Sequence, residues 1–299
     1  MEIIKPGTEI PFLSYRRYAF GLSGLLSLVV LILLLTKGPN LGVDFAGGTM
    51  VHLKFNRTVA IGEVRRALVS MDLGSGVVQD FGAQGSNEFL IRIEKTAGQL
   101  GVVGREIRRG LSDKFGEDQF VVRRVESVGP KVGKDLRQRG TWSVIFATIM
   151  MGAYIWFRFE LRFGLGAVIA LIHDVWITVG ALVLANYEFD LPIVAALLTI
   201  AGYSVNDTVV ICDRIRENLR KFRRDGIEKI INRSINETLG RTILTTLTAL
   251  LVLVALFLFG GGVIRPFAFS LLVGFTSGVY STIFIATPVI LLWERGGKR

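Results

Sequence analysis

Cysteine, histidine and nucleotide-binding loops are scarce or absent in this sequence. Cys212 is the only cysteine among 299 residues, so no disulfide can form within the chain. The two histidines, His52 and His173, are joined by no cysteine or glutamate cluster, so we expect no metal site. Residues 260–262 are glycines, but they lack the following lysine and serine or threonine of a P-loop. We therefore expect no cofactor and no enzymatic activity, and any work that the chain does must draw on something other than ATP bound by it.

The composition excludes an ordinary soluble protein. Hydrophobic residues make up 51% of the chain and the mean hydropathy is +0.49, which together indicate a polytopic membrane protein. The net charge of +10 could suggest a nucleic-acid partner. No aromatic-studded basic motif accompanies that charge, and membrane proteins concentrate Lys and Arg in their cytoplasmic loops. We therefore expect no nucleic acid to bind.

Six runs of about 20 apolar residues, the length that crosses roughly 30 Å of hydrocarbon, predict six membrane spans. The first run ends at residues 35–39 without a small-x-small cleavage site, so we expect it to stay as an anchor. We expect residues 1–36 to hold a cytoplasmic N-terminus and the first span, residues 37–140 a soluble domain, and residues 141–299 a five-helix bundle. The predicted spans are residues 18–36, 141–159, 163–185, 191–213, 242–260 and 267–293.

Lysine and arginine residues gather at one end of this six-span arrangement. They precede the first span, bracket the turn between the second and third, and follow the fourth and the last. Residues 186–190 and 260–262 fall at the other end. By the positive-inside rule we expect both termini to be cytoplasmic and the soluble domain to lie outside. The basic residues are Arg16, Arg17, Arg158, Arg162, Arg214, Arg216, Arg220, Lys221, Arg223, Arg224, Arg295, Lys298 and Arg299.

Alternation and turn signals predict an α+β fold for the soluble domain. The expected order is strand, helix, strand, strand, helix, strand, which is typical of a split βαβ or ferredoxin-like domain. The expected strands are residues 49–55, 76–81, 89–93 and 120–128, and the expected helices are residues 61–71 and 100–115.

The fourth predicted span contains an ionisable side chain, Asp207, which is costly to place inside a membrane. A carboxylate such as Asp207 at a helix centre costs about 2.5–3.5 kcal/mol on insertion scales. Arg241, at the start of the fifth span, is a candidate partner at a similar depth, and Asn206 adds a hydrogen-bonding group beside Asp207. Two interpretations stay open: an ion pair that fastens two helices, or a site that gains and loses a proton as the pair opens and closes.

A second ionisable pair, His173 and Asp174, lies some ten residues into the third predicted span. A packing contact between helices and a proton relay are both consistent with it. Threonines along the fifth span, from Thr242 to Thr248, offer further hydrogen bonds inside the bundle, and such residues serve packing more often than transport.

Four motifs together resemble the SecF group of the SecD/SecF family of protein-export membrane proteins, within the resistance-nodulation-division (RND) superfamily. They run in order along most of the chain. The motifs are LGVDFAGGT at residues 41–49, ALIHDVWITVG at 170–180, GYSVNDTVVICDRIREN at 202–218 and NETLGRTILTTLT at 236–248.

The resemblance implies a multi-pass protein of the bacterial inner membrane that uses the proton motive force to help move preproteins out on the periplasmic side. The implied partners are SecD, the SecYEG translocon, YajC, YidC and the translocating preprotein. The intramembrane Asp and Arg of the family fall on Asp207 and Arg241, while a further Asp comes from SecD. Asn206, Asp174 and His173 are the other candidate proton-coupling residues.

The glycine-rich segment after the first span is a candidate hinge between the span and the soluble domain. Gly42, Gly47 and Gly48 carry this prediction, and a strand start with tight turns explains the same glycines. Two other functions stay open for the whole chain: half of an RND-type exporter of small molecules or lipids, and a passive scaffold for translocon assembly. Nothing near Asp207 discriminates H⁺ from Na⁺ as the coupling ion.

Overall fold

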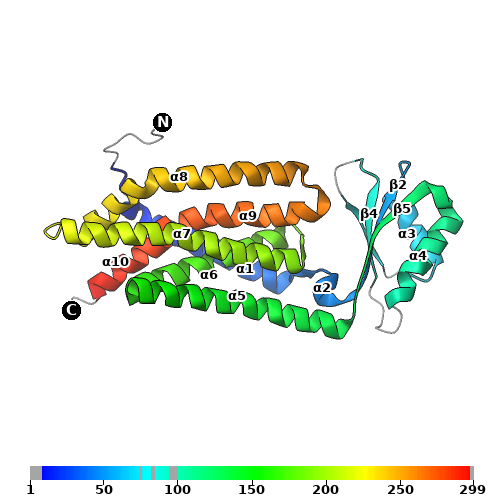
Figure 1. The fold of residues 1–299 in the computed structure, drawn as a ribbon, viewed down its shortest axis with the longest axis horizontal. Helices are drawn as coiled ribbons and strands as arrows, with labels where there is room; N and C mark the ends of the chain where they lie inside the picture. Colours follow the sequence, from blue (N-terminus) through cyan, green and yellow to red (C-terminus); the bar gives the residue numbers. More distant parts are fainter. Residues whose placement is uncertain (1–8, 74–75, 82–84, 94–99, 297–299) are drawn as a thin grey trace.

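A long helix bundle and a smaller α/β domain at one of its ends make up the computed structural model (Figure 1). It describes residues 9–73, 76–81, 85–93 and 100–296. The described part of the chain begins and ends at the end of the bundle that lies opposite the domain (Figure 1). Lys298 and Arg299, which contribute to the predicted orientation, lie outside the described residues.

Within the described residues, six helical stretches are long and apolar enough to cross a membrane, as the sequence predicts. The last stretch is continuous through three segments, of which the middle one, Thr282–Ala286, is a π-helix. The helices are α1 (Arg16–Thr36), α5 (Pro130–Arg158), α6 (Leu161–Leu184), α7 (Leu191–Lys221), α8 (Ile227–Phe259), α9 (Gly261–Ser281) and α10 (Thr287–Gly296), and a short 3₁₀ helix (Phe12–Tyr15) precedes α1.

Two of these helices begin well before their apolar runs. We predicted that the second and fifth spans begin at Thr141 and Thr242, whereas α5 begins at Pro130 and α8 begins at Ile227. Proline suits the first helical position because it lacks the N–H that would stay unbonded there. The polar residues of both extensions continue the helical backbone, so hydropathy alone could not mark the helix starts.

Glycines allow several helices of the bundle to approach closely. A Cβ atom on Gly180 of α6 would lie 2.2 Å from a methyl carbon of Val30 of α1. A Cβ atom on Gly274 of α9 would lie 2.3 Å from the Cδ1 atom of Ile200 of α7, which is fully buried. Small residues at helix interfaces are typical of membrane bundles, where close packing drives association.

The α/β domain contains a four-stranded antiparallel sheet in the order β3–β4–β2–β5. Helices α3 and α4 pack against the sheet through a common apolar core. The elements follow the predicted order and nearly the predicted bounds. They are β2 (Gly48–Phe55), α3 (Ile61–Ser70), β3 (Val77–Phe81), β4 (Glu88–Ile93), α4 (Leu100–Phe115) and β5 (Phe120–Val128), and a short 3₁₀ helix (Glu117–Gln119) precedes β5.

A second, two-stranded sheet lies where the domain meets the bundle. Strand β1 (Asn40–Leu41) follows α1, and strand β6 (Glu188–Phe189) lies in the connection between α6 and α7. The two strands pair in parallel, and the short helix α2 (Val43–Ala46) follows β1. The segment that leads from α1 into the domain is therefore attached to the α6–α7 connection by backbone hydrogen bonds, in addition to the chain connections that join the domain to α1 and α5.

Ion pairs connect the helices at the opposite end of the bundle. Arg16 of α1 binds Glu228 of α8 at 2.6 Å, and Arg214 of α7 binds Glu237 of α8 at 2.7 Å. Exposed ion pairs contribute little stability each, so these contacts mainly fix which helix ends lie together.

We expect Gly274→Ala to destabilise the bundle. The added methyl group would collide with Ile200, and overpacking of this kind costs about 1–3 kcal/mol. The thermal unfolding temperature of the detergent-solubilised protein should fall. Gly21→Ala in α1 is the matched control, because a Cβ atom there meets nothing within 4 Å. Equal unfolding temperatures for Gly274→Ala and Gly21→Ala would contradict the close packing of α7 on α9.

Candidate functional site

Asp174 is a fully buried carboxylate at the meeting point of α6, α7 and α9. Its Oδ2 atom accepts hydrogen bonds from Ser204 and Ser281, each at 2.7 Å. Its Oδ1 atom accepts one from Ser277 at 2.7 Å and lies 3.3 Å from the Nδ1 atom of His173. An ionised carboxylate offers about four acceptor sites. Three serine hydroxyl groups and the His173 ring occupy these sites, so hydrogen bonds from three helices offset the cost of burying the Asp174 carboxylate. We call Asp174 together with Ser204, Ser277 and Ser281 the serine cage.

Local backbone features bring these hydroxyl groups together. Ser277 and Ser281 are four residues apart, so they lie on the same face of α9. Gly278 lies between them, and a Cβ atom there would lie 3.6 Å from the Asp174 Oδ2 atom and 3.3 Å from the Ser204 side chain. The π-helical segment begins directly after Ser281, and its Thr282 hydroxyl lies 3.0 Å from that of Thr208 on α7. Single π-helical turns inside α-helices often occur at functional sites.

His173 extends the serine cage toward α1. Its ring lies 5.9 Å from the ring of Tyr280, whose hydroxyl donates to the Ala19 carbonyl of α1 at 2.8 Å. The Nε2 atom of His173 is buried and has no hydrogen-bond partner in the described part of the chain. The structure therefore brings the predicted pair His173 and Asp174 together, with one histidine nitrogen unsatisfied.

Asp207 lies in the middle of α7 and is 4% exposed. Unlike Asp174, its carboxylate accepts no side-chain hydrogen bond from the residues that the structure describes. Arg241 of α8 is close enough for its charge to act on the Asp207 carboxylate. The predicted partner is thus near, but no ion pair within 4.0 Å joins the two described groups, and Arg241 is exposed.

Two further polar groups on these helices differ in their surroundings. Asn206 is exposed, so it faces away from the buried side of α7 that carries Asp207. Thr242, which follows Arg241 on α8, has a buried hydroxyl with no partner among the described residues. Thr238, Thr245 and Thr248 of α8 donate to carbonyls of their own helix, whereas Thr246 accepts a hydrogen bond from Tyr203 of α7 at 3.5 Å. Buried polar groups normally have hydrogen-bond partners. Asp207 and the Thr242 hydroxyl find none among the described residues, so this part of α7 and α8 can form new polar contacts if the two helices move.

The predicted hinge glycines lie in a packed turn between α1 and β2. Gly47 and Gly48 have positive φ angles of 80° and 119°, which favour glycine. A Cβ atom on Gly47 would lie 3.0 Å from the Pro130 Cα atom, and one on Gly42 would lie 3.0 Å from the Phe189 carbonyl oxygen. The tight turn and the strand start are present in the structure, and the hinge role of these glycines stays a prediction.

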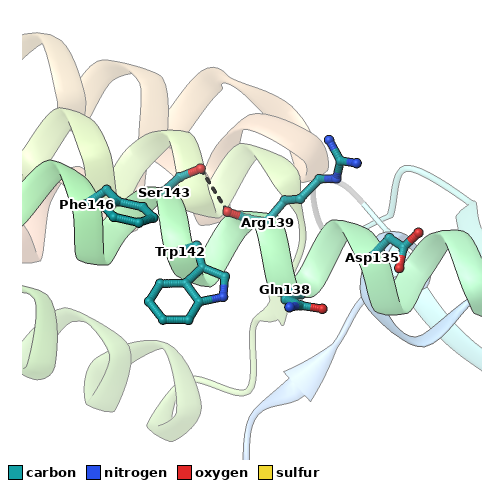
Figure 2. A pocket seen from close by; sticks show the side chains of 6 residues that line it. All are labelled: Asp135, Gln138, Arg139, Trp142, Ser143 and Phe146. Carbon is teal, nitrogen blue, oxygen red and sulfur yellow. Dashed lines mark hydrogen bonds between the residues drawn. The ribbon is translucent and has the colours of Figure 1, made fainter.

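An open hollow of about 840 Å³ lies on the exposed face of α5 (Figure 2). Trp142 and Phe146 form its apolar part, and Asp135 and Arg139 lie toward the end of α5 that is nearer the domain (Figure 2). Tryptophan is enriched where membrane-spanning segments meet water, so this face indicates a membrane boundary. Neither Asp174 nor Asp207 lines the hollow, and we assign no chemistry to it.

The described residues contain no group of three or more His, Cys, Asp or Glu side chains that could hold a metal ion. Sequence analysis missed the serines of α9 that surround Asp174. The only signal for them was the spacing of small residues, with Ser277, Gly278 and Ser281 on one helical face.

Comparisons with known proteins identify relatives over nearly the whole chain. Residues 110–296 match the family model described as "Protein export membrane protein SecD/SecF, C-terminal", and residues 32–59 match "SecD/SecF GG Motif". A "Protein translocase subunit SecF" from Desulfurispirillum indicum is 46% identical over 294 residues, which cover 95% of this chain and 92% of the relative. One from Calditerrivibrio nitroreducens is 42% identical and covers 100% of this chain and 99% of the relative.

Two solved structures share the fold. The crystal structure of SecDF, "a translocon-associated membrane protein", from Thermus thermophilus matches with a TM-score of 0.86 and 34% identity. The match covers 97% of this chain and 39% of the SecDF chain. A structure of "SecDF in Super-membrane-facing form" matches with a TM-score of 0.72 and 34% identity, and covers 100% and 40% of the two chains. The chain therefore spans about two fifths of the SecDF chains that it matches.

We expect Asp174→Ala to destabilise the protein more than Asp174→Asn does. Alanine would leave the surrounding hydroxyl donors without an acceptor, at about 1–3 kcal/mol for each buried group that finds no other partner. Asparagine keeps one acceptor oxygen, and the serine hydroxyls can turn to accept from its amide group. Thermal unfolding of the solubilised protein measures the difference. Wild-type unfolding temperatures for both variants would show that the serine cage does not hold the three helices together.

Proposed function

The chain belongs to the SecD/SecF family of protein-export membrane proteins, and we propose that it is the SecF-type subunit of a proton-driven complex that assists Sec-dependent protein translocation. The family membership and the named relatives support a role in the Sec pathway. The observation that carries the proton-driven part is Asp207 on α7, which is 4% exposed, accepts no side-chain hydrogen bond from the described residues and has Arg241 near it on α8.

The proposed cycle follows from the cost of a buried charge. An ionised Asp207 attracts Arg241, and this attraction draws α8 toward α7. When Asp207 takes up a proton, its negative charge is lost and so is the attraction, and a neutral carboxyl group costs less to bury than a carboxylate. Release of the proton on the other side of the membrane restores the attraction. Alternation between the two states would repack α7 against α8.

We propose that α8 is the helix that moves in this cycle. Its outer face is exposed along much of its length, including Leu247, Leu251 and Leu258, whereas α6, α7 and α9 are joined at Asp174. One elementary charge that crosses 100 mV supplies about 2.3 kcal/mol, which is enough to bias a modest rearrangement of one helix.

The partners follow from the relatives. Because this chain matches about two fifths of each SecDF chain, we propose that a SecD subunit supplies the remaining part, including a further acidic residue at the proton site. We propose SecYEG and the translocating preprotein as the wider partners, with YajC and YidC as accessory proteins. The protein would act by conformational change and not by catalysing a covalent reaction.

We also propose the orientation in the bacterial inner membrane. The described chain ends and the α7–α8 connection lie at the end of the bundle opposite the domain (Figure 1). The predicted positively charged turns lie at that end too, which supports cytoplasmic termini and a periplasmic domain. The strand order β3–β4–β2–β5, with two helices against the sheet, supports a ferredoxin-like fold for that domain.

We predict that Asp207→Asn abolishes the part of preprotein export that depends on the proton motive force. Asparagine has nearly the same shape but cannot take up and release a proton. Export of a secreted preprotein would be followed in cells or membrane vesicles that contain the variant together with SecD, with and without an ionophore that collapses the proton gradient. Wild-type export is expected to slow when the ionophore is added, and export by the variant to be slow in both conditions.

Asp207→Glu is the matched comparison, since it keeps a titratable carboxyl group at the same place. It should keep some ionophore-sensitive export that Asp207→Asn lacks. If Asp207→Asn exports at the wild-type rate, the proton-driven role is wrong and a passive scaffold explains the protein better.

A further inference from the structure

The junction between the α/β domain and the bundle contains a group of charged side chains that the proposed cycle does not use. Asp190 ends the α6–α7 connection and caps α7, because its Oδ1 atom accepts a hydrogen bond from the Ile193 N–H at 3.0 Å. Asp44 of α2 accepts a hydrogen bond from the neighbouring Leu191 N–H at 3.0 Å. Two carboxylates therefore cap the first turn of α7, one from the α6–α7 connection and one from the segment that leads into the domain.

The domain holds the same connection through Glu188. Arg92 of β4 lies 3.4 Å from the Glu188 carboxylate and donates to the Leu41 carbonyl at 2.6 Å. Gln79 of β3 donates to Glu188 at 3.3 Å. The Gly42 N–H donates to the Phe189 carbonyl at 2.8 Å, beside the β1–β6 pair. Side chains of the domain, and the segment that leads into it, thus attach directly to the connection that starts α7.

We infer that Asp44, Arg92, Glu188 and Asp190 form a proton-sensitive latch, which couples the helix that carries Asp207 to the α/β domain when closed and releases it when open. These are positioning residues: they would act through α7, along which Asp207 lies about 25 Å further on at 1.5 Å per residue. The inference rests on the proposed function for its role in translocation.

Asp190 and Glu188 lie outside the membrane-spanning segments. Their surroundings determine whether protons close or open the latch. Burial raises the pKa of Asp190 to about 6, and the nearby negative charges of Asp44 and Glu188 add to the rise. Burial also raises the pKa of Glu188, against the opposing effects of Arg92 and Gln79.

An open latch would return both groups to water and to their ordinary, lower pKa values, so the closed latch binds protons more tightly than the open one. The closed latch is therefore favoured at acid pH. Opening becomes easier as the pH rises through the window between the ordinary pKa of Asp190, 3.8, and about 6. The outer side of an energised membrane is the acid side, so in the proposed orientation the arriving protons would close the latch.

Asp44, Glu188 and Asp190 line a cavity of about 320 Å³, and some of the other charged groups around it have ion-pair partners. His52 lies 2.9 Å from Glu88, and burial, which alone would raise the pKa of Glu88, is outweighed by hydrogen bonds from Lys54 and His52 that hold it below its usual range. Arg124 pairs with Glu126 on β5. The titratable and charged groups that line the cavity beside Asp44, Glu188 and Asp190 are His52 of β2, Asp80 of β3, Arg124 and Glu126 of β5, Tyr187 of the α6–α7 connection and Arg265 of α9.

The latch can be tested by a distance measurement on the full-length chain in lipid nanodiscs. In a Cys212→Ala background, which removes the only native thiol, spin labels would be attached at Arg65→Cys on α3 and Ala185→Cys beside the α6–α7 connection. Both positions are exposed. Pulsed electron paramagnetic resonance then reports the distance between domain and connection. We expect one narrow distance at about pH 5 and a second, longer-distance population at about pH 8.

Asp190→Asn keeps a good helix cap but carries no charge, so it should hold the narrow distance at both pH values. Asp80→Asn is the matched control: Asp80 lines the same cavity but is exposed, and this variant should keep the pH response of the parent. Identical distance distributions at the two pH values in the parent, or an unchanged pH response in Asp190→Asn, would overturn the latch. The readout is a distance and not export, so failure of the Asp207 experiment would leave this result standing.

Discussion

The hydrogen bonds to Asp174 are the constraint on which the bundle depends. A carboxylate inside a membrane bundle is costly unless donors satisfy it, and here the serine hydroxyls come from two helices other than its own. Because all of them must converge on one side chain, α6, α7 and α9 have little freedom to slide or rotate relative to one another. The same cluster explains why small residues are needed at Gly274 and Gly278, where larger side chains would push α9 away.

Relative to Asp174, the middle and the start of α7 have different surroundings. Near its middle, Asp207 has no hydrogen-bond donor from the described residues and only the nearby charge of Arg241 on the more exposed α8. At its start, Asp190 and Asp44 cap the helix and join it to the α/β domain. One helix therefore connects Asp207, the proposed proton site, to the α/β domain, and the hydrogen bond from Ser204 to Asp174 fixes the position of the helix between them.

Much of the fold could be predicted from the sequence because its signals are local. Apolar runs gave six helices, and alternation gave the strands and helices of the domain in the right order. The contacts that assemble the site are not local: Ser277 and Ser281 look like ordinary small residues until packing brings α9 against α6. Residue spacing near Asp207 did not show that Asn206 faces outward or that Arg241 stops short of an ion pair, since both depend on how α7 and α8 are rotated.

The central claim is that two buried carboxylates have separate tasks, with Asp207 exchanging a proton and Asp174 holding helices together. Infrared difference spectroscopy between acid and alkaline conditions, on the full-length protein in membranes, detects the absorption of protonated carboxyl groups directly. The account predicts that Asp207→Asn removes one component of the pH-dependent carboxyl band, whereas Asp174→Asn leaves the band unchanged. A band that is unchanged in Asp207→Asn and loses a component in Asp174→Asn would contradict it.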